Sequence, residues 1–306
     1  MTVHLYPLEP CGVDTADIEA LDSYLLRLAW QHGTTVRELI RVTAANVDAN
    51  SVDRVSIVNR GLTVLVRPEL QPALLVQQLQ VSAPVYAALL PRMTFQCLQK
   101  AFDLPSKALA TTFKWCACCF HQHLVDGTPP YLRLLWHFED VDYCHQHRVK
   151  LQRVCGECGA RQDRKSVRGE LHKCVICAES LAKNGKERPL DSWRHDDQDL
   201  IDLVCSIAKG EFSAAIPGAV RKSINSLFDE AWKMEQEREF WQLIPRNECI
   251  AVVECRMPIT FEMVRRYSKT FQISLADLLL GKTPRTKQLS AFESAQQTTK
   301  RRRGFL

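Results

Sequence analysis

Four pairs of metal-binding residue types lie close together in the middle of the chain, and they constrain its fold more than any other feature. In each pair two residues separate the ligand types, and the pairs are Cys116 with Cys119, Cys144 with His147, Cys155 with Cys158, and Cys174 with Cys177. A two-residue spacer lets one tight turn aim both side chains at one ion, and Zn²⁺ completes a tetrahedron from two such turns. The sequence therefore predicts two bound zinc ions.

The simplest assignment takes the pairs in consecutive order, and a crossed pairing is the alternative. The consecutive order gives a Cys₃His set made of Cys116, Cys119, Cys144 and His147, and a Cys₄ set made of Cys155, Cys158, Cys174 and Cys177. A catalytic zinc usually has three protein ligands and a position for water, whereas both predicted sets are complete. We therefore expect structural zinc ions.

Some nearby residues leave the ligand assignment open. Cys118 could replace Cys119 or Cys116, and His145 lies close to the expected ligand His147, although the two-residue spacing favours His147. The remaining cysteines are scattered, and we expect ordinary buried thiols at Cys11, Cys97, Cys205, Cys249 and Cys255.

The cysteine content also bears on the compartment. The 306 residues include 13 cysteines, yet the chain starts without a basic segment followed by an apolar run, and no uncharged apolar stretch is long enough to span a bilayer. Cysteine pairs in such a chain fit metal binding in a reducing cytosol better than disulfides. We expect a cytoplasmic protein with no membrane partner.

The net charge of +5 is concentrated at the C-terminus. Residues 282–306 contain seven Lys or Arg and one acid, so the rest of the chain is close to neutral. A second basic stretch, residues 148–173, has eight basic residues and three acids. These side chains could donate toward the zinc thiolates or contact a DNA or RNA backbone, and the sequence leaves both interpretations open.

Residues 21–41 have the pattern of a helix–turn–helix unit. Apolar residues recur at helical spacing from Leu21, Gly33 can end the first helix, and Thr35 with Glu38 forms a capping box for the second.

The same pattern returns at 261–281, where Ser274 and Asp277 form the capping box, and more faintly at 94–110. A DNA-reading helix exposes polar side chains, but residues 275–280 offer little besides Asp277. Protein docking or core packing is the favoured role of these units.

These patterns predict a mainly α fold, in which helix–turn–helix-like units flank a central region of two zinc knuckles with short β-hairpins. Further helices are expected at 72–82, 197–209 and 223–241, and loops at Val64–Pro68 and 210–217. The expected organisation is a helical domain at 1–112, a double zinc region at 113–182, a helical domain at 183–284 and a basic tail at 285–306.

An enzymatic alternative is a zinc deaminase, which needs H-x-E followed by P-C-x-x-C. His137 and Glu139 supply the first element, but no proline precedes Cys155, and Cys116, Cys119, Cys174 and Cys177 would have no role. We therefore expect a protein that is not an enzyme.

The central region resembles the TniQ/TnsD family of transposon target-selection proteins. The likeness is carried by the run from Tyr131 to Glu139 around Trp136, by Asp142 to His147, by Leu151 and by Cys155 to Gly159. The helix start at 21–29 is similar to the family's opening, and the whole resemblance covers roughly residues 5–180. The aromatic segment around Trp136 looks most like TniQ of CRISPR-associated transposons.

The resemblance implies a bacterial adaptor that links an RNA-guided CRISPR effector complex, Cascade with its guide RNA, to the AAA+ ATPase TnsC for RNA-guided DNA integration. It also implies that homodimers form in one effector class. The alternative within the family is a TnsD-like protein that reads an attachment site in DNA directly. No catalytic residue is implied, so only the eight metal ligands carry over.

Overall fold

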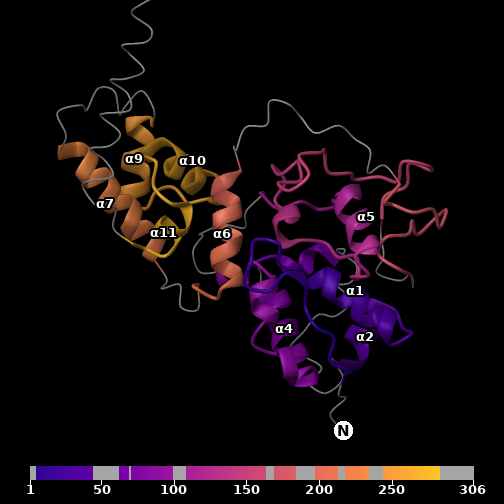
Figure 1. Cartoon of the computed structure of the whole chain (residues 1–306). Coiled ribbons are helices and arrows are strands. Elements are labelled where there is room, and N and C mark those ends of the chain that lie inside the picture. The colour runs from indigo at the N-terminus through magenta and orange to yellow at the C-terminus, as the bar shows by residue number, and fades with distance from the viewer. Residues whose placement is uncertain are drawn as a thin grey trace, which may run out of the picture. The chain divides into compact units, whose positions relative to one another are not determined.

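The computed structural model describes residues 5–43, 62–68, 70–98, 108–162, 169–183, 197–212, 218–233 and 244–282. The regular elements of these residues are helices, as the predicted mainly α fold requires (Figure 1). Extended backbone occurs in the described ranges only as isolated antiparallel bridges, so the expected β-hairpins are reduced to single bridges. No described helix is long and apolar enough to cross a membrane.

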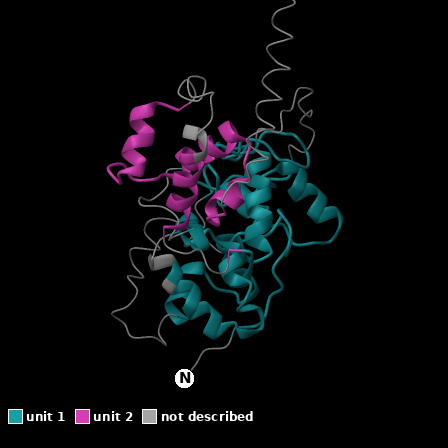
Figure 2. Cartoon of the chain, turned by 90° about the vertical axis from the view of Figure 1, so that its left-hand side faces the viewer, with its two compact units in different colours: residues 1–99, 107–211 teal, residues 100–106, 212–306 magenta. Residues whose placement is uncertain are grey.

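The chain divides into two compact units (Figure 2). Unit 1 comprises Met1–Gln99 and Lys107–Glu211, and unit 2 comprises Lys100–Ser106 and Phe212–Leu306. Unit 1 therefore holds the N-terminal helices together with all eight predicted metal ligands. The finer domain boundaries that the sequence suggested stay predictions.

Unit 1 begins with the predicted helix–turn–helix, formed by α1 (Leu21–Gln31) and α2 (Val36–Thr43). Gly33 follows α1 with a φ of +62°, the left-handed conformation that glycine adopts most readily. The capping box forms in both directions, because Glu38 N–H donates to the Thr35 hydroxyl at 3.2 Å and Thr35 N–H donates to the Glu38 carboxylate at 3.1 Å.

The described residues after α2 in unit 1 form η2 (Leu62–Val66), α4 (Leu70–Ser82), η3 (Pro84–Tyr86), η4 (Leu90–Met93) and η5 (Gln96–Leu98). The predicted loop at Val64–Pro68 is wrong in part, because η2 is buried and lies against α1 and η6. Its apolar side chains lose water by packing there, which a solvated loop would not do. Residues 99–107, within the third predicted helix–turn–helix unit, lie outside the described residues.

The central part of unit 1 contains α5 (Ala117–Val125), η6 (Leu134–His137) and α6 (Gln198–Ala208). A short antiparallel contact fastens it to the start of α1, since Ala20 N–H donates to the Leu132 carbonyl and Leu134 N–H donates to the Ile18 carbonyl, both at 2.9 Å. The large side chains of this core, Trp115 and Trp136, are each 1% exposed.

Unit 2 is helical and contains α7 (Ala219–Lys233), α9 (Arg246–Val253), α10 (Phe261–Phe271) and α11 (Leu275–Leu279). The second predicted helix–turn–helix is confirmed, with the Ser274 hydroxyl accepting from Asp277 N–H at 3.3 Å. Four of the five residues of α11 are buried, so this helix packs inside unit 2. The predicted helix at 223–241 is α7 up to Lys233, and residues 234–243 lie outside the described residues.

The loop before α1 can be tested with two glycines that have the same backbone conformation, of which Gly12 lies in the loop and Gly33 serves as the control. Gly12 and Gly33 have φ of +64° and +62°, but a Cβ on Gly12 would lie 2.3 Å from the Asp17 carbonyl oxygen, whereas a Cβ on Gly33 would meet nothing within 4 Å. Gly33→Ala should lower the free energy of unfolding by about 1–2 kcal/mol from the left-handed backbone alone. Gly12→Ala should cost about 2–4 kcal/mol, because the clash is with backbone. Urea denaturation of both variants measures the difference, and equal losses would contradict the described loop.

Candidate metal centres

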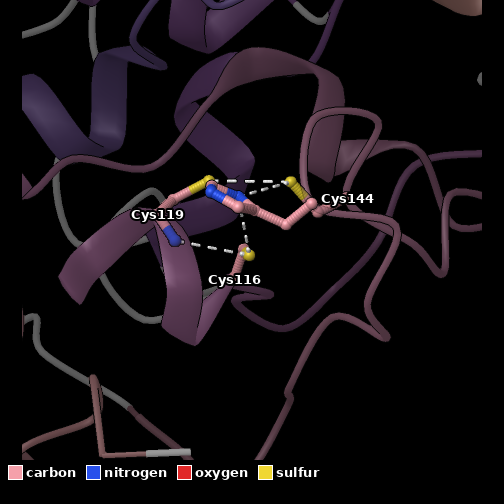
Figure 3. Close-up of side chains that lie close together, drawn as sticks. Cys116, Cys119 and Cys144 are labelled. Atoms are coloured by element: carbon pink, nitrogen blue, oxygen red, sulfur yellow. Dashed lines mark hydrogen bonds between the residues drawn. The ribbon is translucent and has the colours of Figure 1, made fainter. Parts of the chain in front are cut away.

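The eight predicted ligands gather into two groups of four, in the consecutive order that the spacing favours. Site 1 consists of Cys116, Cys119, Cys144 and His147, and site 2 consists of Cys155, Cys158, Cys174 and Cys177. Within each group the ligand atoms all lie within 4.8 Å of one another. Figure 3 shows the three cysteines of site 1 pointing toward a common centre.

The spacing of the ligand atoms fits a tetrahedral ion. In site 1 the Cys119 Sγ lies 3.6 Å from the Cys144 Sγ, and the His147 Nδ1 lies 3.2–3.7 Å from the three sulfurs. Zinc–sulfur bonds of about 2.3 Å in a tetrahedron place the ligands about 3.5–3.8 Å apart. The donor set of thiolates and imidazole, with four protein ligands per site, is also that of structural zinc.

The first pair of ligands is held by the start of α5. Cys116 is the N-cap residue of this helix, and its sulfur accepts a hydrogen bond from Cys119 N–H at 3.5 Å. One turn of helix therefore carries both sulfurs to the same side. The positive end of the helix dipole favours the thiolate form that binds metal.

The other three pairs share one backbone arrangement, which is a zinc knuckle. In each, the first cysteine N–H donates to the carbonyl five residues later, and the N–H four residues later donates back to the cysteine carbonyl, at 2.7–3.0 Å. This tight turn needs a left-handed residue at its fourth position after the cysteine, and the positions are occupied by Arg148, Gly159 and Ala178 with φ of 57–70°. Arg148 and Ala178 adopt that conformation at an energetic cost, which metal binding would offset.

Site 2 is more open than site 1. All three cysteines of site 1 are buried, whereas in site 2 Cys158 is exposed and Cys177 is half-buried. The sulfur pairs Cys155–Cys177 and Cys158–Cys174 lie 3.8 and 3.6 Å apart. Beside them the buried Gln162 amide donates to the Cys174 sulfur at 3.4 Å and accepts from Val175 N–H, so it holds the two knuckles together.

Each site contains one thiol that its surroundings make acidic. Hydrogen bonds from the Cys116 and Cys119 thiols lower the pKa of Cys144. Burial opposes ionisation of Cys174, but hydrogen bonds from the backbone N–H groups of Cys177 and Ile176 lower its pKa to about 6. A thiolate is therefore present near neutral pH in each group, where it can take the first bond to a metal ion.

Two contacts that fasten site 1 have no signal in the sequence. The buried Lys114 ammonium donates to the carbonyls of Phe138, Glu139 and Val141, of which the last is at 2.7 Å. Because Lys114 precedes the first ligand pair and these carbonyls precede the second, the contact holds the two halves of the site together. Burial lowers the pKa of Lys114 to about 8.

The buried His137 side chain also joins two elements. Its Nε2 lies 2.8 Å from the Asp22 carboxylate, and both side chains are nearly inaccessible, so η6 is tied to α1. His137 was the first residue of the zinc-deaminase alternative. Its ring faces Asp22 and lies outside both groups of metal ligands, which removes the support for that alternative.

The structure also places the alternative ligands and the remaining cysteines that the sequence singled out. Neither Cys118 nor His145 belongs to a group of four among the described residues. Of the scattered cysteines, Cys249 is buried, while Cys11, Cys97 and Cys205 are half-buried. Cys255 is exposed, so its expected burial was wrong, because it lies in the turn after α9 with a φ of +58°.

Two of the basic residues near the sites, Arg153 and Lys173, take part in local ion pairs. Arg153 contacts Glu139 and Asp142, at 2.7 and 3.3 Å, and Lys173 contacts Glu170 at 2.7 Å. These pairs reduce the positive charge that the described residues offer to a nucleic-acid backbone.

A groove of about 360 Å³ lies in unit 1 beside site 2. Its lining comes from α1, from the end of α5 and the loop after it, and from the segment before Cys174, and includes Arg27, Trp30, Leu124, Pro129, Leu171 and His172. Trp30 is 48% exposed and Leu124 is 41% exposed. The groove therefore presents large apolar side chains to solvent, which on soluble proteins is typical of contact surfaces.

The TniQ family model matches residues 10–151. This range begins in the loop before α1, includes α2, and ends just after the Cys144–His147 knuckle, so it covers all of site 1. A search of curated proteins found no match.

Removal of one ligand distinguishes the assigned sites. Cys144→Ala should leave one bound zinc per chain, because site 1 loses a buried ligand, while Cys118→Ala should retain two. Elemental analysis of the purified variants by mass spectrometry measures the ratio. Two zinc ions in Cys144→Ala would show that the ligand set is wrong.

The exposure of the cysteines predicts the order of metal loss. A strong chelator should remove the zinc of site 2 faster than the zinc of site 1, because it can reach Cys158 and Cys177 from solvent. Zinc release followed with a colorimetric chelator should show two phases. Cys158→Ser should abolish the fast phase alone, and loss of the slow phase in that variant would reverse the assignment.

Proposed function

We propose that this protein, which carries a TniQ domain over residues 10–151, is a non-enzymatic adaptor that links a Cascade-type CRISPR effector complex to the AAA+ regulator TnsC. The domain makes the chain a transposition-associated protein, and the match to TniQ is the observation that carries the proposal. Two closed groups of four ligands support a structural role for the metal, since neither keeps a position for a reacting water. A cytoplasmic location in a bacterium belongs to the same proposal.

Three features support an adaptor over a TnsD-like reader of DNA. The second helix of the C-terminal helix–turn–helix unit is almost entirely buried, so it offers few side chains for base contacts. Two basic side chains near the metal sites, Arg153 and Lys173, are already paired with acids. In the N-terminal unit, the exposed face of α2 carries only Arg37 and Arg41 as basic groups.

The groove beside site 2 is the surface that we assign to the effector's protein subunits. Its Trp30 and Arg27 side chains are of the types that are enriched among the residues that dominate binding energy in protein interfaces. A phosphate backbone fits it poorly, because the guanidinium of Arg27 is already paired with the buried Glu19 carboxylate. An apolar side chain of a protein partner is the occupant that this groove suits.

Co-purification tests the adaptor role. The tagged protein, expressed with the CRISPR effector complex and guide RNA of its own locus, should form a stable assembly with one or two copies of the chain, as weighed by native mass spectrometry. No association, together with salt-sensitive binding of the lone protein to one duplex site, would make it a direct DNA reader.

The groove can be tested within the same assembly. Trp30→Ala should weaken association at least about tenfold, because exposed tryptophans in an interface core often contribute 2 kcal/mol or more. Val85→Ala is the control, since Val85 is 65% exposed and lies away from the groove lining. Equal affinities of both variants, measured by biolayer interferometry with zinc content unchanged, would remove the groove from the interface.

A further inference from the structure

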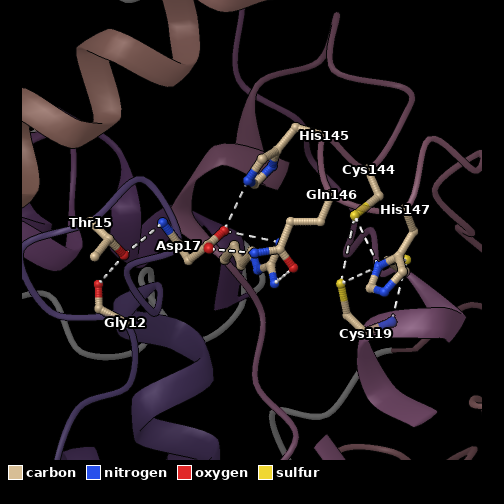
Figure 4. Close-up of polar contacts among 10 residues, drawn as sticks. Gly12, Thr15, Asp17, Cys119, Cys144, His145, Gln146 and His147 are labelled. Carbon is tan, nitrogen blue, oxygen red and sulfur yellow. Dashed lines mark hydrogen bonds and ion pairs between the residues drawn. The ribbon is translucent and has the colours of Figure 1, made fainter. Parts of the chain in front are cut away.

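One acidic side chain from the N-terminal segment contacts both residues that separate the ligands of the second pair of site 1. The Gln146 amide donates to one carboxylate oxygen of Asp17 at 2.7 Å, and the His145 Nε2 lies 3.1 Å from the other. Figure 4 shows Asp17 facing this knuckle, with Cys144 and His147 on the knuckle's far side. The turn that carries the ligands Cys144 and His147 is therefore contacted, on the side away from the ligands, by Asp17, which is distant in the sequence.

The position of Asp17 is itself fixed by its loop. Asp17 N–H donates to the Thr15 hydroxyl at 3.1 Å, and that hydroxyl donates to the Gly12 carbonyl at 2.8 Å (Figure 4). Beyond Asp17, the backbone of Ile18 accepts from Leu134 N–H. These contacts place the Asp17 carboxylate at the knuckle.

Arg133 completes the arrangement. Its side chain is 3% exposed, lies 3.0 Å from Asp17 Oδ1 and donates to the Gln146 amide oxygen at 2.7 Å. A Cys₃His site with Zn²⁺ would carry one negative charge, and a nearby guanidinium favours such a charge. Asp17 and Arg133 thus hold Gln146 from both ends of its amide.

We propose that Asp17 is a positioning residue for site 1, which fixes the conformation of the Cys144–His147 knuckle and thereby couples metal binding to the order of the N-terminal segment. Residues that orient metal ligands from outside the coordination sphere typically change metal affinity 10–100-fold when mutated. The coupling is reciprocal, because whatever Asp17 adds to metal binding the metal adds to the stability of the loop that holds Asp17. The metal at site 1 therefore stabilises the approach to α1.

Two carboxylates of the same loop give a matched test. Asp17→Asn keeps the shape and weakens the contacts to the knuckle, whereas Asp14→Asn removes a carboxylate that faces Arg92 at 3.3 Å. In Asp17→Asn the slow phase of zinc release to a chelator should become about 10–100-fold faster, and in Asp14→Asn both phases should be unchanged. An unchanged slow phase in Asp17→Asn would overturn the proposal.

Two further measurements separate positioning from simple destabilisation. Gln146→Ala removes one knuckle contact and leaves Asp17 with Arg133, so it should accelerate the same phase by a smaller factor. Site 1 loaded with Co²⁺ should change its visible absorption bands in Asp17→Asn, because ligand orientation changes, while site 2 loaded alone should not.

The effect of the metal at site 1 on the loop that holds Asp17 can be measured by hydrogen exchange. Hydrogen exchange at residues 12–20 should speed up when site 1 is emptied through Cys144→Ala, and it should stay unchanged when site 2 is emptied through Cys174→Ala. Equal protection in both variants would contradict the coupling.

Discussion

The gathering of four metal-binding side chains at each of two places is the constraint on which the centre of this protein depends. Between the end of α5 and residue 183, the only described helix is the four-residue η6, and extended backbone is limited to isolated bridges. The knuckles satisfy their own backbone groups, but they enclose few apolar side chains and place Arg148 and Ala178 in a left-handed conformation. Structural zinc contributes about 10–16 kcal/mol per site in small peptides, enough to offset such local costs.

The two sites connect this region to the rest of unit 1 in different ways. Site 1 is buried, begins at the N-terminus of α5 and is fastened to the segment before α1 through Asp17. Site 2 is more open, and the residues before Cys174 form one wall of the groove. The TniQ match covers the first site and the helix–turn–helix unit together, which fits a domain whose metal supports its helices. In the proposed adaptor, site 2 shapes the surface that meets a partner.

The sequence predicts best what is local. The turn within each ligand pair and the capping boxes at Thr35 and Ser274 each depend on contacts within one turn of backbone. The structure has them where the sequence pattern predicts them. Contacts across the fold were not predictable, because a single Asp at position 17 or His at position 137 gives no sign of its distant partner. The buried helix η2 was not predicted for the same reason, because its burial depends on distant segments that its own sequence does not reveal.

X-ray absorption at the zinc edge tests the central claim most directly, because it reports the atoms around the metal without altering the protein. The two sites together offer seven sulfurs and one nitrogen. The fully loaded protein should therefore show two zinc ions per chain in a four-coordinate, sulfur-dominated shell at about 2.3 Å, with a minor nitrogen contribution and no oxygen. A shell containing oxygen, or markedly fewer sulfurs per zinc, would show an open metal site and contradict the structural role.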